Sequence, residues 1–324
     1  MSGVGNFFYV CIYVMTQSKM GRNAHTAKGN SGSLLFHVGA LLTVMAWGVS
    51  FVSTKVLLDN GLRPAEIYVY RFTLAYLMLL AVNHRRLLSN SVRDEVLFMI
   101  CGLCAGSIYF IAENTAIEYT LVSNVSLIVT TSPLITALLV GVIYKSERLG
   151  LGTMAGSVIA FLGVACVIFN SSFVVKMNPI GDLLSLSAAA SWAVYSLVLK
   201  KLNALYSVMF ISRKTFFYGI ITALPYMLFE PGLSSPAVLL DAAVLPHLLF
   251  LGMFASMLAY VVWAQAVKRL GAVKASNYLY FSPIVTLIAS VFFLGEHITV
   301  VGYIGCALIL GGVWLGDLLN RRFR

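Results

Sequence analysis

Residues 264–288 read AQAVKRLGAVKASNYLYFSPIVTLI, and residues 114–138, 150 positions earlier, read NTAIEYTLVSNVSLIVTTSPLITAL. The positions that match are small, hydroxyl or proline residues: Ala116 with Ala266, Ser126 with Ser276, Ser132-Pro133 with Ser282-Pro283, and Thr136 with Thr286. The charges do not match. The later stretch carries Lys268, Arg269 and Lys274, whereas the earlier one carries only Glu118. Both the shared frame and the changed charges need an explanation.

The composition restricts the solvent in which this chain folds. Of its 324 residues, 60% are hydrophobic and 10% are charged, and the mean hydropathy is +0.90. Soluble domains carry about 25% charged residues, so this much apolar surface indicates lipid rather than water. The net charge is +10, but the basic residues form no long run, which argues against a nucleic-acid partner.

Apolar segments predict an all-α integral membrane protein with ten transmembrane helices. A crossing helix needs about 20 mainly apolar residues, and these runs are continuous rather than alternating as in a membrane barrel. The predicted spans are 34–57, 65–82, 96–118, 121–143, 151–170, 181–199, 206–228, 244–266, 273–295 and 298–317. Residues 1–33 are predicted to form a cytoplasmic tail, and the sequence leaves Met1 and Met20 both open as the first residue.

The distribution of cations predicts which ends face the cytoplasm. With both termini inside, most of the 22 Lys and Arg residues fall in cytoplasmic segments, as the positive-inside rule requires. These residues are Lys19, Arg22, Lys28, Arg85, Arg86, Arg93, Lys145, Arg148, Lys200, Lys201, Lys268, Arg269, Lys274, Arg321, Arg322 and Arg324. We therefore expect a multi-pass protein of the inner (plasma) membrane with cytoplasmic termini.

An inverted repeat explains the changed charges. Five helices are an odd number, so a second five-helix unit enters the membrane from the opposite face, and its loops need the opposite charge. The predicted halves are 34–170 and 181–318. Further matches at offsets between 142 and 150 are Trp47 with Trp192, Lys55 with Lys200, Arg71 with Arg213, Gly102 with Gly252, Glu147 with Glu296, Gly156 with Gly305, and Gly163 with Gly312. Inverted repeats are typical of transporters, whose sites lie between the halves.

The doubled order of these motifs resembles the EamA-type family of the drug/metabolite transporter superfamily. The residues that carry the resemblance are AWG at 46–48, SWA at 191–193, YRF at 70–72, SRK at 212–214, SPLITALLVGVIYKSE at 132–147 and SPIVTLIASVFFLGE at 282–296. It covers residues 34–318. The resemblance implies a ten-helix bundle with a central cavity and alternating access, and a secondary transporter that exports amino acids or other small metabolites.

Buried charges are the first candidate site residues. Arg71 falls within a predicted span, where a cation should face the interior and find a partner, and Glu113 lies at a similar depth on the next helix. An Arg71–Glu113 pair either locks two helices together or takes part in binding the substrate or a proton. In the second case, proton uptake by Glu113 would couple export of the substrate to proton entry. Arg213 is a candidate for binding carbonyls, a substrate carboxylate or water, while Lys214 is expected to snorkel to the interface. Trp263 occupies the position equivalent to Glu113.

Prolines and aromatic residues complete the candidate site. Pro133 and Pro283 should kink their helices at the carbonyls of Val129 and Leu279, either as static bends or in gating. A small organic substrate would suit the polar residues Asn114, Gln265, Ser276 and Asn277 together with the aromatic residues, although packing explains many of the latter equally well. The aromatic candidates are Trp47, Tyr109, Phe110, Trp192, Tyr195, Tyr260, Trp263, Tyr278 and Tyr280.

No enzymatic or cofactor motif accompanies these residues. A Walker A motif is absent, and the C-x-x-C of Cys101 and Cys104 lies on a predicted membrane helix with no second pair of ligands. We therefore predict no metal, no cofactor and no catalytic residue. The expected partners are a small-molecule substrate and the lipid bilayer, for a monomer or homodimer. A channel or sensor, and a membrane-embedded lipid-modifying enzyme, are the alternatives to a transporter.

Overall fold

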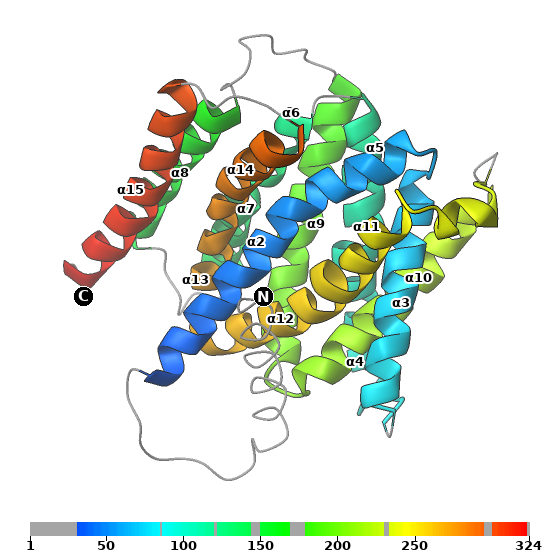
Figure 1. Ribbon diagram of the computed structural model, residues 1–324. Coiled ribbons are helices and arrows are strands. Elements are labelled where there is room, and N and C mark those ends of the chain that lie inside the picture. The colour runs from blue at the N-terminus through cyan, green and yellow to red at the C-terminus, as the bar shows by residue number, and fades with distance from the viewer. Residues whose placement is uncertain are drawn as a thin grey trace.

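The computed structural model describes residues 31–84, 86–119, 122–143, 150–168, 179–229, 233–294 and 300–322. Every regular element in these ranges is helical (Figure 1). The first half contains α2 (Ser31–Asp59), α3 (Pro64–Val82), α4 (Val92–Gly102), η1 (Leu103–Ser107), α5 (Ile108–Tyr119), α6 (Val122–Val129), α7 (Ser132–Ile143) and α8 (Leu151–Ile168). The second half contains α9 (Pro179–Leu202), α10 (Val208–Phe229), η2 (Pro236–Leu240), α11 (Leu245–Leu249), η3 (Phe250–Leu258), α12 (Ala259–Leu270), α13 (Ala272–Ser276), η4 (Asn277–Phe281), α14 (Ser282–Leu294) and α15 (Val300–Arg322).

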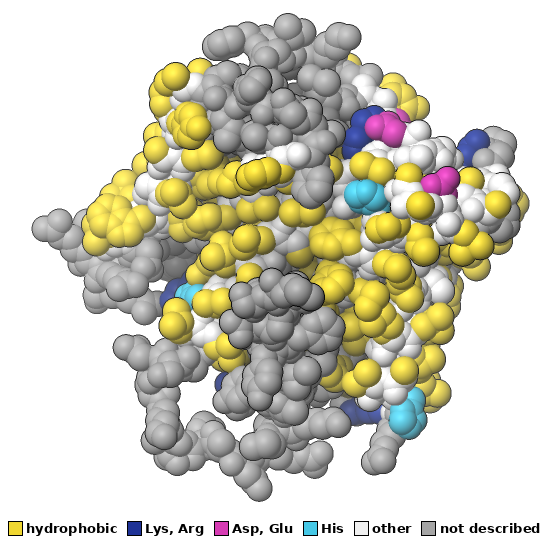
Figure 2. All heavy atoms as spheres, in the orientation of Figure 1, with side chains coloured by type: hydrophobic (Ala, Val, Ile, Leu, Met, Phe, Trp, Pro, Cys, Tyr) yellow, Lys and Arg dark blue, Asp and Glu magenta, His cyan; other side chains and the backbone are white. Residues whose placement is uncertain are grey.

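The helices confirm the predicted all-helical class. Among the described residues, five helical stretches are long and apolar enough to cross a membrane: Leu34–Asp59, Pro64–Val82, Val92–Tyr119, Pro179–Leu202 and Leu245–Leu270. Shorter apolar helices occupy Ser132–Ile143, Met154–Cys166 and Val300–Gly316. Figure 2 shows hydrophobic side chains over most of the visible face, with charged groups at its upper and lower margins. Most of the tail (residues 1–30) and the repeated Glu147 and Glu296 lie outside the described residues.

The first helix of each half packs against the other half. Helix α2 contacts α12 and α14, and α9 contacts α5 and α7 in the matching way. Helices α3 and α10 pack on each other, as do α8 and α15, which stand side by side at the left of Figure 1. In the same view α2 runs upward and α9 runs downward. The two halves therefore pack closely against each other, and their first helices run in opposite directions.

The third helix of each half contains a π-helical stretch at the same place in the repeat. Segment η1 follows Gly102, and η3 includes Gly252, so both irregular stretches lie at glycines that match in the sequence. Inside η1 the backbone of Gly106 leaves the helical region, with φ −122° and ψ −106°. Such π-bulges widen a helix locally and are frequent at functional sites. Here η1 joins α4 to α5, the helix that carries Glu113.

The fourth helix of each half is broken just before its Ser-Pro pair. Residues 121–143, predicted as one span, divide into α6 and α7 at Thr130 and Thr131, whose hydroxyls donate to the carbonyls of Ser126 and Ile128 (both 2.6 Å). In the second half, the 3-10 segment η4 precedes α14. The kinks predicted at Pro133 and Pro283 stay predictions, supported by the turn at Thr130 and Thr131 and by the 3-10 segment η4 just before each Ser-Pro pair. Both breaks face the same pocket.

Candidate functional site

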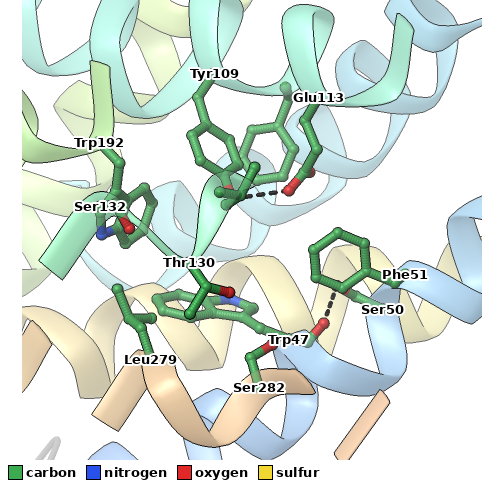
Figure 3. Close-up of a pocket in the computed structure, with 12 residues that line it drawn as sticks. Trp47, Ser50, Phe51, Tyr109, Glu113, Thr130, Ser132, Trp192, Leu279 and Ser282 are labelled. Atoms are coloured by element: carbon green, nitrogen blue, oxygen red, sulfur yellow. Dashed lines mark hydrogen bonds between the residues drawn. The ribbon is translucent and has the colours of Figure 1, made fainter. Parts of the chain in front are cut away.

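A pocket lies where the two halves meet. It holds about 530 Å³ of space that no atom occupies, and this volume includes its open mouth. Its walls come from α2, α5, α9 and the broken regions of α6–α7 and η4–α14 (Figure 3). The residues that line it are Trp47, Ser50, Phe51, Tyr109, Phe110, Glu113, Val129, Thr130, Ser132, Trp192, Leu279 and Ser282.

Glu113 is the only acidic residue among the described residues that line this pocket. The residue is 7% exposed, and Figure 3 shows its carboxylate directed from α5 into the space between α5 and α2. The hydroxyl of Tyr109, one helical turn earlier, donates to the Glu113 carboxylate at 2.8 Å. Within the described part of the chain Glu113 forms no ion pair. The charge of Arg71 acts on this carboxylate only through space, and a proton or a cationic ligand would stabilise the buried group further.

Tryptophan rings form one wall of the pocket. The rings of Trp47 and Trp192 meet edge to face at 5.2 Å, and those of Trp47 and Trp263 lie 5.1 Å apart. The Trp47 indole N–H donates to the carbonyl of Ala255 at 2.9 Å, so the side chain is held in a fixed orientation. Trp47 and Trp192 occupy the same position in the two repeats. Their contact therefore joins equivalent residues of the two halves, and the pocket lies beside it.

Arg71 and Glu113, predicted as a pair, form no direct ion pair among the described residues, although their charges interact through space. Arg71 is 1% exposed on α3, and its Nε donates to the hydroxyl of Ser256 at 2.9 Å. Its guanidinium carbon lies 4.7 Å from the centre of the Phe110 ring, an arrangement that stabilises a cation in a dry interior. Sequence reasoning missed this because η3, whose path the pattern does not reveal, supplies Ser256. Phe110 therefore borders Arg71 as well as the pocket.

Arg213 and Lys214 serve the other end of the bundle. Arg213 donates to the backbone carbonyls of Asn83 and Arg86, so of the three predicted roles it has the carbonyl-binding one. Lys214 was expected to snorkel, but it is buried and its Nζ lies 2.8 Å from a carboxylate oxygen of Glu95. The snorkelling stays a prediction, and the acidic partner lies in the first turn of α4. These contacts fasten the α3–α4 connection and α4 to α10.

The remaining predicted site residues are divided between the pocket wall and the interior. Trp47, Tyr109, Glu113 and Trp192 line the pocket, and Pro133 and Pro283 are buried directly after residues that line it. The others lie elsewhere: the amide of Asn114 donates to the carbonyl of Pro64 at 3.1 Å, Trp263 and Gln265 are buried in α12, and Asn277 borders a small cavity beside Tyr280 and Gly312.

Sequence reasoning did not select several lining residues as site residues. Ser50 and Phe51 come about one turn after Trp47, so helical spacing was a usable signal. Ser132 and Ser282 were recognised as repeat positions but not as pocket residues, although their place before each proline marks the breaks. Thr130, Val129 and Leu279 line the pocket only because the helices break beside them, and the pattern showed the kink but not its direction.

Apolar helices with irregular segments beside a central pocket are typical of membrane transporters. The chain belongs to the EamA-like transporter family, whose model matches residues 34–169 and 179–316. The two matched stretches make the chain a doubled EamA protein. The family and the names of its relatives indicate a multi-pass membrane transporter of small molecules rather than an enzyme.

Relatives match nearly their whole length. An "uncharacterized transporter" of Archaeoglobus fulgidus is 28% identical over 86% of this chain and 96% of its own length. A "probable terminal-alkyne amino-acid exporter" of Streptantibioticus cattleyicolor is 27% identical, over 87% and 92%. A "probable amino-acid metabolite efflux pump" of Escherichia coli is 24% identical, over 88% and 95%. One crystal structure of a protein shares the fold, with a TM-score of 0.72, 21% identity, and coverage of 91% of this chain and 100% of that one.

Proposed function

We propose that this protein is a secondary carrier that exports small organic metabolites, amino acids and their derivatives among them, across the cytoplasmic membrane by alternating access. The observation that carries the proposal is the pocket lined by helices of both halves, including both broken helices. Two relatives named as amino-acid or amino-acid-metabolite exporters support this substrate class. Helix ends and unwound backbone beside a pocket are typical of carriers, because they offer polar groups at mid-membrane.

In this proposal the chain crosses the membrane ten times, with residues 34–170 and 181–318 as inverted halves and both termini in the cytoplasm. The opposite directions of α2 and α9 and their matching contacts support the inversion. A cysteine replacing exposed Pro179 and another at the carboxyl tail, in a background without the five native cysteines, should label from opposite sides. Labelling of both from the same side would refute the inverted arrangement.

Within the pocket, Trp47, Tyr109, Glu113 and Trp192 contact the substrate, and the breaks before Pro133 and Pro283 act as the gating bends. Glu113 takes up a proton from outside and releases it inside, which drives export. Its support is its position: buried, directed into the pocket and bonded to the Tyr109 hydroxyl. The ring of Trp47 packs against those of Trp192 and Trp263 beside the pocket, which gives the substrate a fixed aromatic surface.

Reconstituted vesicles test this function. Amino acids and their amine derivatives are first screened by thermal shift of the purified protein, because a ligand of the folded state raises its apparent stability. Each hit is then measured in saturable counterflow and in uptake driven by a pH gradient. Glu113→Gln should remove the response to the pH gradient while counterflow at saturating solute persists. Conductance that does not saturate would identify a channel, and an unchanged pH response in the variant would exclude Glu113 as the proton site.

A further inference from the structure

The pocket wall has a chemical bias that the proposed function does not use. Five aromatic side chains line it, together with the hydroxyls of four Ser and Thr residues. Among the described lining residues there is one carboxylate, that of Glu113, and no Lys, Arg or His. The faces of aromatic rings are negative and attract cations. The carboxylate and the ring faces of the wall therefore favour a positive ligand.

Glu113 supplies the only negative charge among the described residues that line the pocket. Its carboxylate accepts a hydrogen bond from Tyr109 at 2.8 Å, and it has no ion-pair partner among the described residues. Trp47 and Phe51 face it across the pocket from α2 (Figure 3). An ammonium group placed beside the carboxylate would gain a charge-assisted hydrogen bond while its carbon skeleton packs on these rings. Neither a neutral nor an anionic head group could replace that contact.

A ligand carboxylate finds no cationic side chain among the described lining residues. The buried cation Arg71 does not line the pocket. Its Nε is bonded to Ser256, and its guanidinium is stacked on the ring of Phe110, the residue that does line it. The ammonium group of a zwitterionic amino acid would thus find a carboxylate partner in the pocket, whereas its own carboxylate would find no cationic side chain there.

We infer that the pocket selects organic ammonium compounds with an apolar body, recognised by Glu113 and the surrounding rings, and that it gives no preference to a carboxylate on the same molecule. Decarboxylated or esterified amino acids fit this class better than free amino acids. The inference rests on the proposed transport site, but it concerns binding and is measurable without transport.

Four probes with one skeleton separate the contributions: 2-phenylethylamine, phenylalanine, 3-phenylpropionate and 2-phenylethanol. Binding to the purified full chain is followed by the fluorescence of its tryptophans, two of which, Trp47 and Trp192, line the pocket. We expect the amine to bind about tenfold or more tighter than the alcohol, from the value of a hydrogen bond to a charged group. Phenylalanine should bind no tighter than the amine, and the propionate weakest.

Two variants complete the test. Glu113→Gln should abolish the preference for the amine over the alcohol while leaving alcohol binding as in the wild type, which also shows that the pocket is intact. Asp59→Asn removes the same charge at an exposed position of α2 and should leave all four affinities unchanged. Tighter binding of phenylalanine or the propionate, an amine preference that survives Glu113→Gln, or no binding by any probe would overturn the inference.

The outcomes also separate this inference from the proposed function. Saturable counterflow of a zwitterion or an anion without any preference for amines would refute ammonium selection and leave the carrier intact. Selective amine binding with no flux of the bound amine would support the site and refute the carrier.

Discussion

Substituting Gly102 by alanine tests how closely the third helix of the first half approaches α10. A Cβ atom built on Gly102 lies 2.6 Å from the backbone nitrogen of Gly219 and 2.6 Å from Cβ of Tyr218. Ordinary contacts of this kind begin at 3.4 Å, so the two helices must separate by about 0.8 Å, the difference of the two distances. Backbone atoms cannot rotate away as a side-chain end can. Overpacking of this kind costs ~1–3 kcal/mol, of which the better helix propensity of alanine offsets up to ~1 kcal/mol.

Two other glycines supply matched controls for Gly102→Ala. At Gly252, the equivalent residue of the second half, the new Cβ meets the Cδ2 atom of Leu74 at 2.7 Å, a side-chain end that can move, and the backbone oxygen of Arg71 at 3.2 Å, a milder clash than at Gly102. At Gly311, on α15, nothing lies within 4 Å, so alanine should be neutral or stabilise by up to ~1 kcal/mol.

Thermal unfolding of the purified variants should therefore rank Gly311→Ala at or above the wild type, Gly252→Ala below it and Gly102→Ala lowest. If Gly102→Ala unfolds at the same temperature as Gly311→Ala, the helices are not in backbone contact at Gly102, and the reasoning fails.

Three further predictions concern polar contacts, each measured by thermal unfolding. Glu95→Gln should lower the free energy of unfolding by ~3 kcal/mol because it leaves the buried ammonium of Lys214 without its counterion. Lys214→Met should cost less, since Glu95 keeps its hydrogen bonds from the Tyr218 hydroxyl and the Ser89 amide. Equal losses of stability in the two variants would contradict this reasoning. His37→Phe and Tyr278→Phe should each lower stability by ~1 kcal/mol, because each variant removes the same 2.6 Å hydrogen bond between α2 and η4. The double variant should lose no more stability than either single variant. Additive losses would count against that bond. Asp59→Asn should change stability by less than ~0.5 kcal/mol, because its ion pair with Lys55 is exposed; a larger loss would mean that Asp59 has a further role.

The sequence predicted those features that depend on local backbone chemistry. Proline removes a hydrogen bond wherever it stands within a helix, so Pro133 and Pro283 indicated both breaks before any tertiary contact was known. The spacing of Tyr109 and Glu113, four residues apart, is a further local signal, because it places both side chains on one face of a helix. Their hydrogen bond was not predicted, although this spacing allows it. Repetition of such local signals at a constant offset is sufficient to predict two similar halves.

Features that depend on how the helices cross could not be predicted in this way. The depth of Arg71 and Glu113 was consistent with a contact, yet the π-helical stretches shift the phase of the third helices, and Ser256 reaches Arg71 instead. Lys214 was placed by a rule for single helices in lipid, whereas its partner Glu95 comes from another helix. Periodicity assigns a residue to a face of its own helix, and only the packed bundle determines which residue faces it.

The difference between the two halves limits what the pocket can do. Offset by 150 positions, Tyr109 corresponds to Ala259 and Glu113 to Trp263. The second half therefore contributes a fully buried indole, packed 5.1 Å from the ring of Trp47, where the first contributes a carboxylate and its hydrogen-bond donor. Inverted halves can exchange conformations during a cycle, but only one of them brings an ionisable group to the described pocket wall. If Glu113 is the coupling site, each cycle exchanges one proton, and an ammonium ligand must compete with that proton for the same carboxylate.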